Sequence, residues 1–180
     1  FAGHGDVENT INQYGYLRSY DTPYQNYANN AVKIEDFNIM ANTLSLEKEA
    51  KVILITDACH SGKLARSDNQ GRQLIGEQLS KAENKEIRIA SCESDQLAQE
   101  DLVWGGGRGA FSYYLVKGLS GLADDGEKDG VVTLQEIKNY LGKVVPEDVD
   151  KFMQKDQNPV FTGKNIQKLS FIGNLPKYVT

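Results

Sequence analysis

The pattern of hydrophobic and polar positions predicts strands and helices that follow one another along the chain. Residues 52–55 (VILI) form an unbroken apolar run, which is typical of a central parallel strand covered on both faces. Residues 86–90 (EIRIA) alternate between apolar and polar side chains and predict a second strand. Two further strands are predicted near the end of the chain, at residues 159–163 and 168–172. Together with the helices described next, these strands predict an α/β fold.

Three segments carry apolar residues at the spacing of an amphipathic helix. The first covers residues 34–46, and its apolar stripe is expected to lie in the core. The third begins at Leu134 and is expected to end at Pro146, because proline has no amide hydrogen to continue the helix. The three stripes are Ile34, Phe37, Met40 and Leu44; Phe111, Tyr114, Leu115 and Leu119; and Leu134, Ile137, Leu141, Val144 and Val145.

A group of polar and small residues follows the apolar run 52–55 directly. It reads Asp57, Ala58, Cys59, His60, Ser61 and Gly62. In open α/β sheets, ligands bind outside the carboxyl ends of the strands, so Cys59 is placed where such folds carry their chemistry. A thiol in this position becomes a nucleophile when a base or a positive environment stabilises its thiolate.

The chain offers two histidines as the base, His4 and His60. His60 adjoins Cys59, and because neighbouring side chains diverge, it is interpreted as a polar turn residue. His4 lies in the segment FAGHGD, which is predicted to be the end of another strand, and it precedes Cys59 by 55 positions. The preferred pair is therefore His4 and Cys59.

The two segments FAGHG and DACHSG resemble the caspase-like cysteine peptidases, and specifically their metacaspase and paracaspase branch (peptidase family C14, clan CD). Caspases separate His and Cys by about 50 residues. The resemblance implies a caspase-like three-layer αβα sandwich with a mostly parallel central sheet, as a single domain over residues 1–180. It also implies two strands and a helix before His4, which are expected to be missing from this chain or supplied by a cleaved N-terminal fragment of the same protein.

The resemblance further implies peptide-bond hydrolysis by a Cys-His dyad. Cys59 would attack the scissile carbonyl and His4 would transfer the proton, while backbone N–H groups of Gly5 and Cys59 would form the oxyanion hole. True caspases carry Gln two residues before the nucleophile and select an acidic P1 residue. Here that position is Asp57, which in the metacaspase pattern faces an Arg or Lys at P1.

A second acid is expected in the same pocket. In the family it follows the strand that corresponds to residues 86–90, where Asp95 is the best match and Glu93 the second. Two carboxylates around one pocket repel each other, and a guanidinium or ammonium group would relieve that repulsion. The alternative for Asp95 is the N-cap of a helix over residues 96–101.

Two segments are predicted to be loops. Residues 104–109 contain three consecutive glycines, and in the family a loop here borders the substrate groove. Residues 63–85 are rich in charge, and the family often cuts itself after basic residues in such loops. The candidate self-cleavage sites are Lys63, Arg66 and Arg72, with solvated surface charge as the alternative. Cys92 is interpreted as a small buried residue.

Residues 125–136 (DGEKDGVVTLQE) fit the template of an EF-hand calcium loop, with Gly130 at the turn. The candidate calcium ligands are Asp125, Glu127, Asp129 and Glu136. The alternative is an acidic turn that caps the helix beginning at Leu134. Glu35 and Asp36 match part of a second calcium site that metacaspases use. No cofactor is required by the dyad, and calcium is the one metal that the sequence suggests.

The amino-acid composition limits the classes of protein to which the chain can belong. The 180 residues are 25% charged and 39% hydrophobic, which is typical of one soluble globular domain. The net charge of −5 argues against a nucleic-acid partner, and no apolar run approaches the roughly 18 residues that a membrane span requires. We expect a soluble protein, with the cytoplasm favoured, whose partner is a peptide or protein with a basic P1 residue.

Three other interpretations stay open at the sequence level. The domain could be a catalytically inactive caspase-like scaffold, or a calcium-responsive interaction module in a larger bacterial protein. It could also be another clan member, such as a clostripain-like or separase-like peptidase, that uses the same dyad.

Overall fold

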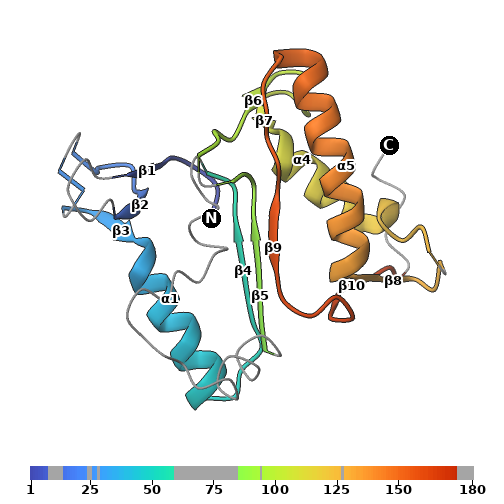
Figure 1. Cartoon of the computed structure of the whole chain (residues 1–180), viewed down its shortest axis with the longest axis horizontal. Coiled ribbons are helices and arrows are strands. Elements are labelled where there is room, and N and C mark those ends of the chain that lie inside the picture. The colour runs from blue at the N-terminus through green and yellow to red at the C-terminus, as the bar shows by residue number, and fades with distance from the viewer. Residues whose placement is uncertain are drawn as a thin grey trace.

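The computed structural model describes residues 1–7, 14–23, 26–27, 29–58, 85–93, 95–126 and 128–173, and it has a mixed α/β fold (Figure 1). Its elements are β1 (Gly5–Val7), β2 (Gly15–Arg18), β3 (Ala31–Lys33), α1 (Ile34–Asn42), the π-helical turn η1 (Thr43–Glu47), β4 (Val52–Thr56), β5 (Glu86–Ala90), β6 (Glu100–Asp101), β7 (Arg108–Gly109), α4 (Ala110–Lys117), the π-helical turn η2 (Gly118–Leu122), β8 (Val131–Thr133), α5 (Leu134–Met153), β9 (Val160–Thr162) and β10 (Lys168–Phe171). The strands expected in all four segments named above are therefore confirmed.

The central sheet has the strand order β4-β5-β9. Strands β4 and β5 are parallel, with Val52 opposite Glu86 and Thr56 opposite Ala90. Strand β9 pairs with β5 in the antiparallel direction. The sheet described is therefore small and mixed, rather than mostly parallel. The described residues also form three antiparallel sheets, made by β1-β2-β3, by β8 with β10 and by β6 with β7.

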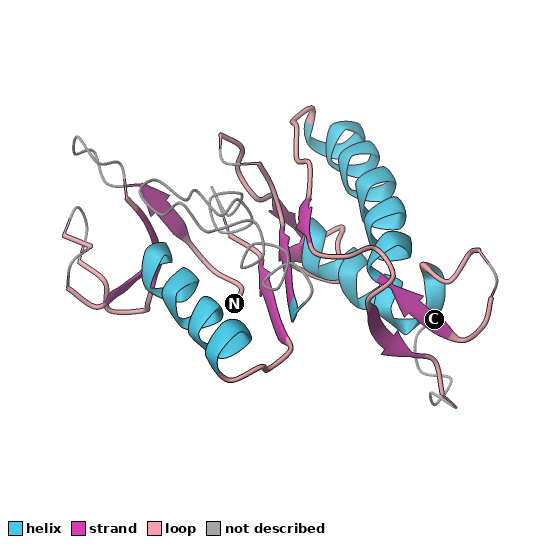
Figure 2. Cartoon of the chain, turned by 60° about the horizontal axis from the view of Figure 1, so that its bottom comes forward, coloured by secondary structure: helices cyan, strands magenta, loops and turns pink. Residues whose placement is uncertain are grey.

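Helices cover both faces of the central sheet, as Figures 1 and 2 show. On one face, Ile87 and Ile89 of β5 are buried in the main hydrophobic core, which includes Phe111 of α4 and Leu141 of α5. On the other face, Leu54 of β4 packs in a second, smaller core that α1 helps to form. Because alternate residues of a strand point to opposite faces, β5 presents Ile87 and Ile89 to α4 and α5, and its polar residues to α1.

The polar face of β5 carries a buried ion pair. Glu86 is 6% exposed and Arg88 is 3% exposed. Arg88 Nη2 lies 2.7 Å from Glu86 Oε2, and Arg88 Nε donates to the same oxygen at 3.1 Å. Asn38 of α1 accepts from Arg88 Nη1, and Ser45 of η1 donates to Glu86 Oε1. The alternation in EIRIA therefore separates an apolar core face from a buried polar face, not from a solvent face.

The expected core stripe of the first helix is wrong in its second half. Ile34 is buried, but Met40 is 50% exposed and Leu44 is 40% exposed. Helix α1 ends at Asn42 and passes into η1, and there the buried positions are the small residues Ala41 and Ser45. Since this side of the helix meets the ion pair of β5, small and polar side chains are favoured there over large apolar ones.

The expected end of the last long helix at Pro146 is also wrong, because α5 continues to Met153. Pro146 removes one backbone hydrogen bond, but Val145 and Val149 continue the buried face of the helix past it. The residue four positions before it is Gly142, which carries no side chain. Packing of the apolar face thus outweighs the local effect of the proline.

Residues 96–101 do not form the helix that was the alternative for Asp95. The described part of this segment is a turn and a loop, followed by β6, so the N-cap interpretation is wrong. The glycine loop is confirmed as irregular, with φ angles of 62° at Gly105, 86° at Gly106 and 110° at Gly107, which only glycine adopts readily. Among the described residues, no helix combines the length and the apolar character needed to cross a bilayer.

Candidate active site

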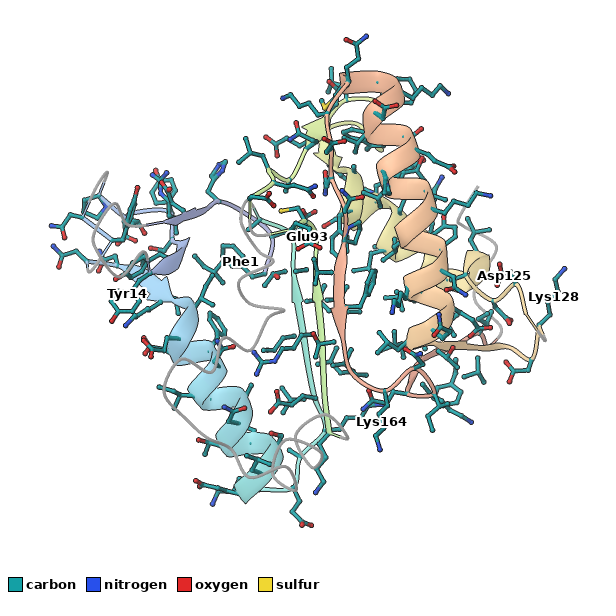
Figure 3. All side chains as sticks on the ribbon, viewed as in Figure 1. Phe1, Tyr14, Glu93, Asp125, Lys128 and Lys164 are labelled. Carbon is teal, nitrogen blue, oxygen red and sulfur yellow. The ribbon has the colours of Figure 1, made fainter. Side chains whose placement is uncertain are left out.

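The first three residues run alongside the carboxyl end of β4. Ala2 forms a parallel bridge with Asp57. Gly3 N donates to Asp57 O and Asp57 N donates to Phe1 O, each at 2.9 Å. The segment that carries His4 is therefore a neighbour of β4 and runs in the same direction. Figure 3 shows Phe1 and Glu93 at the same end of the sheet, the end at which β4 and β5 finish.

A pocket of about 340 Å³ opens at this end of the sheet. Its walls come from the N-terminal segment, the end of β4, the chain leading into β6, and the junction between β7 and α4. The lining residues are Ala2, Gly3, His4, Asp57, Ala98, Gln99, Glu100, Arg108, Gly109 and Ser112. Two predicted site residues, His4 and Asp57, thus share one pocket although 53 positions separate them.

The carboxylate of Asp57 is held by the first turn of α4. Asp57 is 8% exposed, and its Oδ2 accepts hydrogen bonds from Ser112 N at 3.1 Å and from Ser112 Oγ at 2.6 Å. Ser112 is the third residue of α4, whose N-cap Gly109 has no side chain to cap the helix. Asp57 therefore replaces the missing N-cap side chain, and its negative charge faces the positive end of the helix dipole.

The absence of a side chain at Gly109 is required by this arrangement. A Cβ atom at Gly109 would clash with Asp57 Oδ2. In contrast, Asp57 Oδ1 accepts no hydrogen bond from any residue that the structure describes. One carboxylate oxygen is thus committed to α4, and the other has no hydrogen-bond donor among the described residues.

Other charges around the pocket come from Glu100 and Arg108, both exposed at its rim. The lining carries two carboxylates, of Asp57 and Glu100, against the one guanidinium of Arg108. Such a lining attracts a cationic group, provided that the group approaches Asp57 rather than Arg108.

The residue before Cys59 is fixed by the end of β5. Ala58 N donates to Ser91 Oγ at 3.1 Å, and the same hydroxyl donates to Ala58 O at 3.2 Å. Cys92 Sγ also lies 3.5 Å from Ala58 O, and Cys92 is fully buried, which confirms its expected burial. Gln157 in turn donates to Ser91 O at 3.0 Å. The chain is therefore held firmly up to Ala58.

Several predicted site residues lie away from the pocket or outside the residues that the structure describes. Asp95 is exposed, and neither Asp95 nor Glu93 lines the pocket. Gly5 begins β1 and is paired with Leu17. Glu35 is exposed and forms an ion pair with Lys33 at 2.6 Å. Cys59, His60, Lys63, Arg66, Arg72 and Glu127 all lie outside the residues that the structure describes.

The acidic segment near α5 has the geometry of a helix cap. Glu136 Oε2 accepts from Thr133 N and from Thr133 Oγ1, each at 2.8 Å, and Glu136 N donates to Thr133 Oγ1. This capping box is the alternative interpretation of the segment, and it is confirmed for Glu136. Asp125 and Asp129 are exposed, and Gly130 has a φ of 79°. Within the described ranges, no three acidic, His or Cys side chains are grouped to hold a metal ion.

Calcium binding by this segment stays a prediction. In Figure 3, Asp125 and Lys128 lie on the other side of α5 from Phe1 and Glu93. They line a second pocket, which shares Arg108 with the pocket at the end of β4. The charged and hydroxyl-bearing pocket residues Glu100, Arg108 and Ser112 were not predicted as site residues from the sequence. Arg108 lies within residues 104–109, the loop that was expected to border the groove, and this position is the sequence signal that could have identified it.

Comparisons with known proteins add no relative. The chain matches no protein-family model, and it matches no curated protein.

Proposed function

We propose that this protein is a cysteine endopeptidase that cleaves peptide bonds after Arg or Lys, with Cys59 as nucleophile and His4 as general acid and base. The observation that carries the proposal is the parallel pairing of Ala2 with Asp57. His4 lies two residues after Ala2, and Cys59 lies two residues after Asp57. The two paired segments run in the same direction and meet at the carboxyl end of β4, which supports a dyad formed by the residues that follow them.

The negative pocket supports a basic P1 residue. Asp57 lines it with one oxygen that accepts no hydrogen bond from the described residues, and Glu100 adds a second carboxylate at the rim. An ammonium or guanidinium group binding at Asp57 would form a charge-assisted hydrogen bond in a largely buried position. Glu100 is thus a second candidate acid beside the predicted Asp95.

The proposed reaction has two steps. The Cys59 sulfur bonds to the scissile carbonyl carbon, the C–N bond breaks, and His4 passes the thiol proton to the leaving amine. His4 then takes a proton from water, whose oxygen attacks the thioester carbonyl and releases the acid and the thiol. Backbone N–H groups of Gly5 and Cys59 are the proposed oxyanion donors, each typically contributing about 3 kcal/mol.

The fold is consistent with a caspase-like αβα sandwich, which we propose as its finer class. Helices lie on both faces of the central sheet, β4 and β5 are parallel, and β4 ends at the pocket. A short antiparallel strand, β9, completes the described part of the sheet.

Fluorogenic peptides that differ only at P1 test the proposal. We expect cleavage after Arg and Lys but not after Asp, loss of cleavage in Cys59→Ala, and full activity in the matched control Cys92→Ala if that variant folds. Asp57→Asn should reduce kcat/KM for Arg far more than for a neutral P1 residue. Assays with calcium and with a chelator decide whether the metal is needed. Cleavage after Asp, or activity retained in Cys59→Ala, would refute the assignment.

The competing proposal is an inactive scaffold with the same fold. An electrophilic peptide with Arg or Lys at P1 separates the two, because an enzyme is labelled at Cys59 and a scaffold is not. Intact mass and peptide mapping of the labelled protein give the answer directly.

A further inference from the structure

We infer that Ser112 determines how the pocket distinguishes guanidinium from ammonium groups, by occupying one oxygen of Asp57. This inference rests on the proposed function, since it concerns the same candidate P1 pocket. It adds a specificity-determining residue that lies 55 positions beyond Asp57 and belongs to neither predicted motif.

The argument begins with the lone pairs of the carboxylate. Each oxygen of an ionised carboxylate accepts about two hydrogen bonds. Ser112 supplies two donors to the same atom, its backbone N at 3.1 Å and its hydroxyl at 2.6 Å from Asp57 Oδ2. Both acceptor positions of Oδ2 are therefore filled, while Oδ1 accepts from none of the described residues.

The two basic head groups need different numbers of free acceptors. A guanidinium group gains its advantage over an ammonium by a fork of two parallel N–H donors, one to each carboxylate oxygen. An ammonium makes point contacts and needs one free oxygen. With Oδ2 filled, Asp57 offers Oδ1 alone, so Arg loses its second hydrogen bond and Lys loses nothing.

The filled oxygen cannot easily turn away from α4. Asp57 is buried, its backbone is paired on one side with Phe1 and Gly3, and Gly109 lies directly against Oδ2. The Ser112 amide is the third N–H of α4 and needs an acceptor because no earlier helix carbonyl is available to it. The carboxylate is therefore held with Oδ2 against the start of α4.

Removing the Ser112 hydroxyl should restore the second acceptor position. In Ser112→Ala the backbone donor stays, so α4 keeps its cap, and one position of Oδ2 becomes free for the guanidinium fork. We expect the preference for Arg over Lys to rise about tenfold, as one extra charge-assisted hydrogen bond predicts. Ser112→Thr keeps the hydroxyl and should leave the ratio as in the wild type.

Two measurements test this, and one does not depend on catalysis. The first is the ratio of kcat/KM for matched P1-Arg and P1-Lys peptides. The second is the ratio of dissociation constants for butylguanidinium and pentylammonium, measured by calorimetry on the full chain. Ser120→Ala is the matched control, since Ser120 does not line this pocket. Ser112→Cys, a weak donor, should shift both ratios in the same direction as Ser112→Ala and serves if the alanine variant does not fold.

The outcomes separate the inference from the proposed function. If the cations bind in the expected ratio but no peptide is cleaved, the peptidase proposal fails and the role of Ser112 stands. If peptides are cleaved but neither ratio changes by more than twofold in Ser112→Ala and Ser112→Cys, the role of Ser112 is refuted. Absence of binding by both cations to the wild type would also refute it.

Discussion

Replacing Arg88 by Met tests the polar layer between β5 and α1. The substitution keeps a long side chain but removes the guanidinium, which makes contacts to Glu86 and to Asn38. Glu86, at 6% exposure, would keep only the Ser45 hydroxyl as a described partner. Breaking a buried pair in this way costs about 3–5 kcal/mol, because the remaining charge stays buried without compensation.

Urea denaturation gives the measurement. The free energy of unfolding falls by roughly 2 kcal/mol per molar urea in a protein of this kind, so a loss of about 4 kcal/mol in that free energy lowers the urea midpoint by about 2 M. The double variant Glu86→Leu/Arg88→Met removes both charges and should recover most of that loss, since apolar side chains often replace a buried pair without cost. Lys33→Met is the surface control: its partner Glu35 is exposed, so the change should cost less than about 1 kcal/mol.

A loss below about 1 kcal/mol in Arg88→Met would refute the reasoning. It would mean that Glu86 reaches water when Arg88 is gone, and hence that α1 does not seal this face of β5. Failure of the double variant to recover stability would instead place the cost in lost packing of the arginine stem.

Two further predictions concern α4. Gly109→Ala should displace the Asp57 carboxylate, because the new Cβ clashes with Oδ2. We expect lower thermal stability and weaker binding of a P1-Arg inhibitor. Unchanged inhibitor binding would contradict the placement of Asp57. Burial, assisted by the hydrogen bond to Asp148, raises the pKa of Tyr114 well above its ordinary value of 10.0. Since the folded state holds this proton more tightly, the stability that it contributes is complete below pH 10 and falls as the pH rises further. In Tyr114→Phe, the urea midpoint should therefore decrease less between pH 9 and 11 than in the wild type. An equal decrease in both proteins would exclude Tyr114 as the origin.

Much of the fold follows from local patterns, and the exceptions have tertiary causes. The apolar run of β4 and the positions of β5, β9 and β10 are readable from the sequence alone. The burial of Glu86 and Arg88 is not, because the groups that compensate them, Ser45 and Asn38, lie 41 and 50 positions away. The continuation of α5 past Pro146 likewise depends on a core that no local rule describes.

The candidate site shows the same division. The common edge of His4 and Asp57 was predictable, because each was expected at the end of a strand on the same rim of the sheet; in the structure the His4 segment joins β4 through an isolated bridge. The role of Ser112 was not, since it depends on which helix begins beside Asp57. Asp95 was chosen by its position after β5, whereas the chain there leads through a turn and brings Glu100 to the pocket instead.

The residues that hold the pocket in place come almost entirely from later parts of the chain. Ser91 at the end of β5 fixes Ala58, and Gln157, just before β9, fixes the Ser91 carbonyl. Ser112 fixes the carboxylate of Asp57, and this requires α4 to be formed. Because each contact spans 33 positions or more, the pocket can exist only after the second half of the molecule has folded onto β4. The same dependence gives Asp57 two linked roles, since the carboxylate that binds a cation through Oδ1 stabilises the start of α4 through Oδ2. A ligand that pulls Asp57 away from Ser112 must therefore uncap that helix, which favours ligands satisfied by one oxygen.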